Sequence, residues 1–184
     1  MSKWWVIFLF LVGCNSKATK FYPMPWKVGQ WVTYTVNEEP LKIAVTGQES
    51  TFFWLETVES EAIVKVLVTE HDLSNPNRII VKKLGEPAVE FPLEDFSIKA
   101  NLSDVKLDEF TEFTTEYLTL LCGKFKAFHI KEGETDIWLS NKIPLFGIVR
   151  YKDDDKTIVL RDYGLSGAQS EINEEPEVAS IVLE

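Results

Sequence analysis

Histidine and cysteine are scarce in this chain of 184 residues, which contains two of each. It also lacks an HExxH pair, a Gly-x-Ser-x-Gly elbow, a phosphate-binding glycine loop and a paired CxxC. An enzyme needs groups that converge on one site, and these absences leave no recognisable catalytic set. We therefore expect a protein that is not an enzyme and that holds no cofactor and no metal.

The few reactive side chains have simpler interpretations. We expect His71 and His129 to lie at the surface or to support other residues. Cys122 and His129 could form a nucleophile and its base, but their spacing along one strand sends them to opposite faces unless a bulge at Gly123 changes the register. The run Asp153–Asp155 could offer oxygens to calcium, but three adjacent acids in a hairpin are more typical of a solvated turn.

Positive charge is also in deficit, with 19 Lys and Arg against 29 Asp and Glu and a formal net charge of −10. An acidic surface repels phosphate backbones and anionic headgroups. The composition therefore argues against a nucleic-acid partner and against membrane contact through a basic patch.

The N-terminal stretch Met1–Cys14 is typical of an export signal. Lys3 precedes an apolar run that is too short to cross a ~30 Å hydrocarbon core. The run ends in Leu11-Val12-Gly13-Cys14, which resembles the bacterial lipobox, where the signal is cut before the cysteine and the thiol receives a diacylglycerol. We expect residues 1–13 to be a lipoprotein signal peptide and Cys14 to be lipidated. The alternatives are an ordinary signal peptide and a buried N-terminal segment.

Lipidation would place the protein in the bacterial cell envelope, tied to a membrane by its N-terminal acyl chains. Residues 14–27, with Pro23 and Pro25, would form a lipidated tether. Asn15 resembles an outer-membrane sorting signal, so we expect the protein on the outer membrane, facing the periplasm. Cys122 would remain as a lone thiol, and its apolar neighbours favour a buried residue over a reactive one.

From Gln30 onward the apolar residues recur with period two, which predicts short strands joined mostly by hairpins. About nine to eleven strands make a large antiparallel sheet that must curl or close. We expect the folded domain to span 28–170 and the acidic tail 171–184 to fray, with an edge strand from Val178, Ile181, Val182 and Leu183 as the alternative. The expected strands are Gln30–Val36, Leu41–Thr46, Thr51–Ser60, Glu61–Thr69, Arg78–Lys83, Ala88–Pro92, Thr114–Leu121, Phe125–Lys131, Thr135–Leu139, Gly147–Lys152 and Lys156–Tyr163.

The two strands within Thr51–Thr69 are apolar on both faces. A strand with water on one side should alternate, so another sheet, a helix or a bound apolar molecule must cover the second face. Large side chains near strand ends could line such a pocket, although each could equally fill a core. The candidate ligand-binding residues are Trp31, Phe53, Trp54, Leu55, Phe125 and Trp138.

Several segments together resemble bacterial envelope lipoproteins related in fold to the LolA/LolB lipoprotein-localisation proteins. The resemblance implies a mainly β fold, a single curved antiparallel half-barrel with a small helical or irregular cap, here Leu93–Leu107, over an apolar concave face that holds acyl chains. No segment matches the specific lipoprotein-transfer residues of those proteins. The segments are Val28–Tyr34, Phe53–Glu56, Cys122–Ala127, Trp138–Ser140, Ile143–Val149 and Tyr163–Ala168.

These features lead to two hypotheses of function. The first is a non-enzymatic, lipid-anchored envelope protein that binds a lipid or acyl chain in the concave face. The second is a structural or regulatory lipoprotein that contacts an envelope protein partner and has no ligand cavity.

Overall fold

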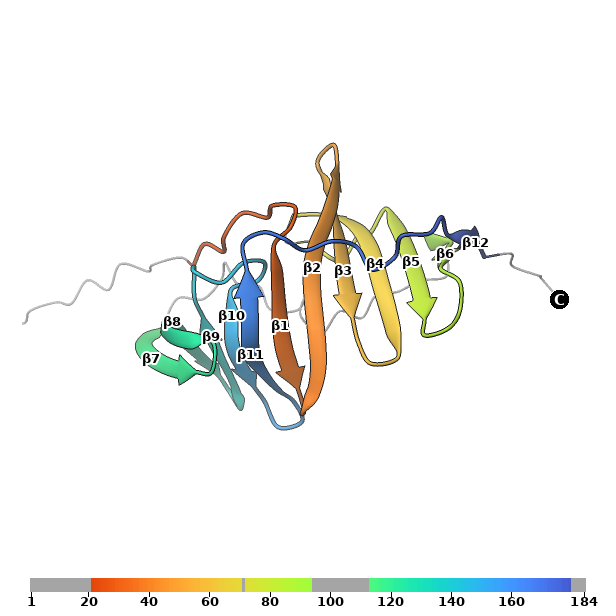
Figure 1. Cartoon of the computed structure of the whole chain (residues 1–184). Coiled ribbons are helices and arrows are strands. Elements are labelled where there is room, and N and C mark those ends of the chain that lie inside the picture. The colour runs from red at the N-terminus through yellow and green to blue at the C-terminus, as the bar shows by residue number, and fades with distance from the viewer. Residues whose placement is uncertain (1–20, 71, 94–112, 180–184) are drawn as a thin grey trace, which may run out of the picture.

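The computed structural model describes residues 21–70, 72–93 and 113–179, and within them the protein is mainly β, as predicted, with no α-helix. Twelve strands form one open sheet (Figure 1). No helix among these residues is long and apolar enough to cross a membrane. The strands are β1 (Trp31–Val36), β2 (Glu39–Glu49), β3 (Phe52–Val58), β4 (Ala62–Thr69), β5 (Arg78–Lys83), β6 (Val89–Phe91), β7 (Thr114–Leu120), β8 (Gly123–Glu132), β9 (Thr135–Leu139), β10 (Ile148–Lys152), β11 (Thr157–Gly164) and β12 (Glu177–Val178).

Two antiparallel meanders make up the sheet. Strands β1 to β6 each pair with the next strand in sequence, and so do β7 to β11. The meanders join where β1 pairs with β11, while β12 adds a short parallel strand beside β6. Figure 1 shows β7 and β8 turned across the direction of β1 to β5, so the sheet is strongly twisted.

The eleven expected strands correspond to β1 to β11, with differences at two turns. Asn37 and Glu38 both have positive φ, 47° and 77°, as in a two-residue type I′ turn, so β2 already begins at Glu39. The turn expected at Gly47–Ser50 is largely strand. Gly47 lies at a register shift in β2. A Cβ at this position would lie 3.2 Å from Trp54 Cδ1, a tight contact that favours glycine there.

The main hydrophobic core lies on one face of the sheet, which we call the inner face. It includes Tyr34, Leu139 and Leu160, each at most 2% exposed, and burial of a side chain of this size contributes about 1.5–3 kcal/mol. Two segments pack onto this face: the N-terminal segment with Phe21 and Trp26, and the β9–β10 loop. The core residues of that loop are Ile143, Leu145 and Phe146.

The opposite, outer face is crossed by the C-terminal segment Leu165–Ala179, which we call the strap. Figure 1 shows it running from the end of β11 past β1 to β5 towards β6. Lys42 Nζ and Glu171 Oε1 are 2.7 Å apart and Lys82 Nζ and Glu174 Oε1 are 2.6 Å apart, so ion pairs connect the strap to β2 and β5. Ile172 of the strap is buried in a second apolar cluster with Trp54, Leu67, Ile80 and Ala88.

The strap explains the strands that are apolar on both faces. The second face of β3 and β4 is covered by the chain's own Ile172 and Ala88. The expectation that the tail frays is therefore wrong for residues 171–179, where Val178 lies in the short edge strand β12, while Ile181, Val182 and Leu183 lie outside the described residues. The domain also begins before residue 28, because Phe21 and Trp26 are buried in the core. The proposed cap lies outside the described residues except for Leu93.

Candidate functional site

On the inner face of β2 to β6, residues that pair across neighbouring strands form two rows of side chains. Each row runs across the strands, and we call the two rows the inner rows. Successive partners along each row come from neighbouring strands, so their side chains lie side by side. Apart from Thr57, both rows are apolar throughout. The rows are Val45–Leu55–Val66–Ile79–Phe91 and Ile43–Thr57–Val64–Val81–Val89.

The inner rows differ from the other half of the inner face in what covers them. The half formed by β8 to β11 is filled by the β9–β10 loop, where Ile143 and Leu145 are completely buried. Towards β3 the described cover is Trp26, whose ring meets Phe53 edge-on at 5.9 Å between centroids and Phe146 at 5.8 Å. Both halves are buried, since Val45 and Ile79 of the inner rows are 0% exposed as well, and Trp26 lies where the two halves meet.

Three of the six predicted ligand-binding residues belong to the inner core. Phe53 and Leu55 lie on β3 with the inner rows and are 8% and 3% exposed. Phe125 belongs to the same cluster but lies on β8, where its ring contacts Tyr163. Of the six residues, only Leu55 belongs to an inner row, and Phe53 lies beside it on the same face of β3.

The other three residues lie elsewhere. Trp54 follows Phe53 in the strand and so points to the outer face, where Lys65 and Arg78 lie over its ring at 5.3 and 5.1 Å. Trp31 lines a groove under the strap. Trp138 on β9 is only partly buried; it packs against the main core and belongs to a polar cluster around His129. The six residues do not line a single pocket.

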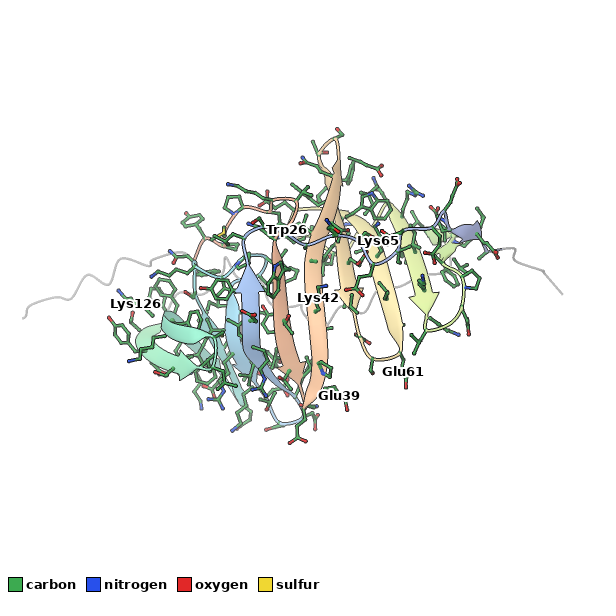
Figure 2. The ribbon with its side chains drawn as sticks, viewed as in Figure 1. Trp26, Glu39, Lys42, Glu61, Lys65 and Lys126 are labelled. Carbon is green, nitrogen blue, oxygen red and sulfur yellow. The ribbon has the colours of Figure 1, made fainter. Side chains whose placement is uncertain are left out.

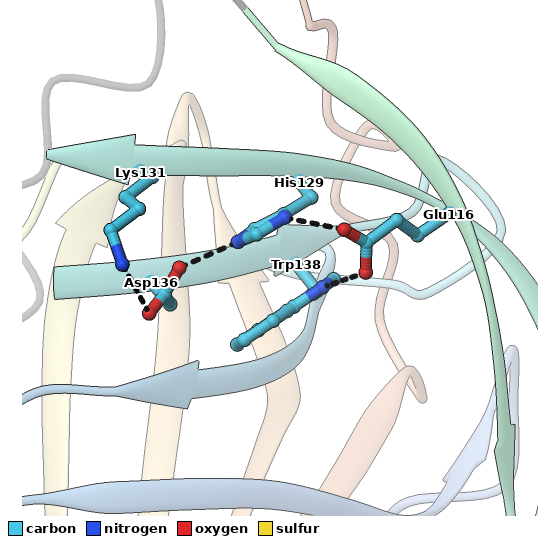
Figure 3. Close-up of polar contacts among 5 residues, drawn as sticks. All are labelled: Glu116, His129, Lys131, Asp136 and Trp138. Atoms are coloured by element: carbon cyan, nitrogen blue, oxygen red, sulfur yellow. Dashed lines mark hydrogen bonds and ion pairs between the residues drawn. The ribbon is translucent and has the colours of Figure 1, made fainter.

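The cluster around His129 joins three neighbouring strands (Figure 3). His129 on β8 faces Trp138 on β9, and their rings stack with centroids 4.3 Å apart and planes 7° apart. His129 Nδ1 lies 2.7 Å from Glu116 Oε1 of β7, and Nε2 lies 2.7 Å from Asp136 Oδ1 of β9. The indole N–H of Trp138 donates to the second oxygen of Glu116 at 2.9 Å.

These contacts favour the ionised carboxylates. The hydrogen bonds from Trp138 and His129 lower the pKa of Glu116, and the hydrogen bond from His129 lowers the pKa of Asp136. A neutral imidazole has one N–H, whereas the protonated ring can donate to both carboxylates. Because both ring nitrogens face carboxylates of the protein, His129 connects β7, β8 and β9.

The suggested pair of Cys122 and His129 is not formed. Cys122 lies in the turn before β8, and its thiol is 3.9 Å from the carbonyl oxygen of Leu160. Burial raises the pKa of this thiol, which disfavours the nucleophilic thiolate. Sequence spacing alone could not have revealed the true partners of His129, because Glu116 and Asp136 meet it only through the register of three strands.

The acidic run Asp153–Asp155 forms a turn, as predicted. Asp153 Oδ1 accepts hydrogen bonds from the backbone N–H groups of Asp155 and Lys156 at 2.9 and 2.6 Å. Its other oxygen accepts the Tyr151 hydroxyl, which lowers the pKa of Asp153 and raises that of Tyr151 to about 12. Among the described residues no group of His, Cys, Asp and Glu is arranged to hold a metal ion. Cys14 and His71 lie outside the described ranges.

No family model, curated protein or solved structure matches this chain. Its function therefore has to be inferred from its own residues. The similarity to the LolA/LolB-like proteins remains a prediction from the sequence segments that carry it.

Proposed function

We propose that the protein is a lipid-anchored lipoprotein of the bacterial envelope, attached through Cys14, that binds a lipid or acyl chain against the inner rows without catalysing a reaction. In this proposal the curved sheet acts as a half-barrel of the LolA/LolB-like type, and Leu93–Leu107 provides the cap. The N-terminal lipid holds the domain beside a bilayer, within reach of apolar ligands.

The observation that carries this proposal is the continuity of the inner rows. Five neighbouring strands, about 4.8 Å apart, give each row a length of about 19 Å. This is comparable with the depth of one leaflet, which is about half of the ~30 Å hydrocarbon core. A row of this length offers one acyl chain apolar contact along its whole extent.

Several side chains of the inner rows are buried, so a ligand would have to displace whatever covers them. Val45 and Ile79 are completely buried and Val66 is 7% exposed, so an acyl chain would replace protein side chains on this face. Trp26 is the described side chain at the boundary of the rows, where it rests edge-on against Phe53. The filled half around Leu145 would stay closed.

A pair of matched substitutions tests the site. Val66→Thr puts a hydroxyl group in the middle of an inner row, and Val149→Thr makes the same change in the filled half, where Val149 is also buried. Both should cost about 1–3 kcal/mol of stability because a buried hydroxyl loses its hydration. Only Val66→Thr should weaken binding of a fluorescent fatty-acid probe, by about tenfold or about 1.4 kcal/mol.

Native mass spectrometry of the full-length protein after gentle extraction supplies the second measurement. We expect an adduct with the mass of one lipid, which disappears on delipidation and returns with added fatty acid. A delipidated protein with no affinity for acyl probes would overturn the proposal. Recovery of the same envelope protein in repeated pull-downs, with no lipid bound, would then favour the structural or regulatory alternative.

The absence of catalysis has its own test. Combined substitution of His71, His129 and Cys122 should leave the cellular phenotype of the gene intact, provided the protein accumulates normally. Loss of the phenotype at normal protein levels would indicate a chemical role for at least one of the three.

A further inference from the structure

A groove on the outer face, separate from the inner rows, lies between the strap and strands β1 and β2. Its volume is about 750 Å³, which is within the usual range for small-molecule sites. Trp31, Thr33 and Lys42 come from the strands, while Gln169, Glu171 and Asn173 are among the strap residues that line it. Figure 2 shows Lys42 and Lys65 on β2 and β4, the strands that the strap crosses.

The indole of Trp31 is the aromatic surface of this groove. Trp31 pairs with Gly164 across β1 and β11, and a Cβ at Gly164 would lie 2.3 Å from Trp31 Nε1 and 2.6 Å from Cε2. The ring therefore lies over the bare backbone of Gly164. Trp31 is half-buried, so part of this indole remains accessible from the groove. Glycine at position 164 is what permits this placement.

Polar groups surround the indole. The Trp31 N–H, the Thr33 hydroxyl and the Asn173 amide make no hydrogen bond within the described part of the chain, so each can bind a ligand. Gln169 is exposed and adds a further amide. Hydroxyl and amide groups both donate and accept hydrogen bonds. The groove therefore combines one aromatic surface with several donors and acceptors.

The charges of the groove balance. Lys42 Nζ lies 2.7 Å from Glu171 Oε1, so its one cation is paired with a carboxylate of the strap. A phosphate-bearing ligand would meet no unpaired positive charge there and would be repelled by a chain of net charge −10. The groove is thus suited to a neutral ligand.

Other neutral ligand classes fit less well. An acyl chain would contact mainly hydroxyl, amide and charged groups, whose hydration it could not replace. An extended peptide gains affinity by pairing with a strand edge, but β1 and β2 both have strands on either side. A sugar ring has C–H groups that can pack on an indole and hydroxyl groups that can bond to the amides around it. We propose that this groove binds a short neutral saccharide.

The strap wall of the groove is held in place before any ligand binds. Buried Glu56, 1% exposed, accepts the Ser170 hydroxyl at 2.6 Å and the backbone N–H of Glu171 at 2.8 Å. Lys65 donates to the same Ser170 hydroxyl at 2.8 Å. A wall fixed in this way lowers the ordering cost of binding.

The test uses the full-length protein in mild detergent and three neutral probes: maltotetraose, cellotetraose and tetra-N-acetylchitotetraose. Saturation-transfer NMR and calorimetry should detect binding of at least one of them. For that probe, Trp31→Ala should weaken binding by about tenfold or more, equivalent to about 1.4 kcal/mol, and Trp31→Phe should retain part of it. Trp138→Ala, which removes an indole outside the groove, is the matched control and should leave affinity unchanged.

A second variant guards against misfolding of Trp31→Ala. The double change of Gln169→Ala and Asn173→Ala removes exposed amides from the strap and should weaken the same probe while the melting temperature stays constant. The proposal is overturned if none of the three saccharides binds, if binding survives both the Trp31→Ala and the double variant, or if Trp138→Ala weakens it equally. None of these outcomes depends on the inner rows, so this test is independent of the acyl-binding experiments.

Discussion

Truncation of Ile172 to alanine should loosen the strap. This side chain is 5% exposed and is the strap's member of the outer cluster with Trp54, Leu67 and Ile80. Three carbon groups at about 0.8 kcal/mol each give about 2.4 kcal/mol of lost transfer free energy. If the cavity left by the missing side chain does not collapse, the loss of stability should be larger, within the range of about 2–5 kcal/mol seen for such truncations. Since the strap is peripheral, the loss should appear first as local opening.

Hydrogen exchange measures that opening directly. The amides of Ala168, Glu171 and Glu177 donate to Gly29, Glu56 and Ala88, so their exchange reports release of the strap. A cost of about 2.4 kcal/mol corresponds to exchange that is about fifty times faster, while amides in the middle of β1 should be unaffected.

The matched control for this experiment is Val178→Ala. Val178 also lies on the strap, but its side chain is 74% exposed, so its truncation should leave the three amides at wild-type rates. If Ile172→Ala also left the rates unchanged, the strap would be held by its polar contacts and the reasoning from apolar burial would be wrong.

Three further predictions concern the sheet and its loops. Leu139→Ala, at a position of 0% exposure, should lower the unfolding free energy measured with urea by about 2–5 kcal/mol, and a loss below about 1 kcal/mol would contradict the core assignment. Gly147→Ala should cost about 1–3 kcal/mol, because φ is +72° there and the new Cβ would lie 2.6 Å from Phe21 Cζ; an unchanged melting temperature would disprove this. The hydrogen bond from Arg78 lowers the pKa of Glu90 in the folded protein. Glu90 therefore contributes to the free energy of unfolding above the unfolded pKa, and this contribution is lost as the pH falls through the folded pKa. Glu90→Gln should make the loss of stability in acid less steep, and a pH profile identical to that of the wild type would refute this.

The strands were predictable from the sequence because their signal is local. Alternation of the kind seen in Val32, Tyr34 and Val36 identifies a strand without reference to anything distant. The strap has no such period. Ile172 stands alone among Asn and Glu residues, and its burial depends on Leu67 and Ile80, which are far away in the sequence. A single apolar residue in an acidic tail therefore gave no reason to expect a packed segment.

The site was predictable only in part. Alternation correctly separates Phe53 from Trp54, so aromatic content alone was a poor guide to which rings share a pocket. The His129 cluster could not be predicted, because Glu116 and Asp136 reach the imidazole only when three strands take one particular register. The groove at Trp31 depends on the strap, which the sequence did not reveal.

The pairing of β1 with β11 has a consequence for how the chain assembles. Both strands lie in the middle of the sheet, yet they come from opposite ends of the described chain. The backbone N–H of Thr157, the first residue of β11, donates to the side chain of Asn37, which follows β1, across 120 positions. Contacts of such long sequence separation form slowly, because a large loop must close first. The pairing of β1 with β11 would thus form only after both meanders exist. A deletion that reaches into β1 or β11 would split the sheet in two, whereas loss of an edge strand would only make the sheet narrower.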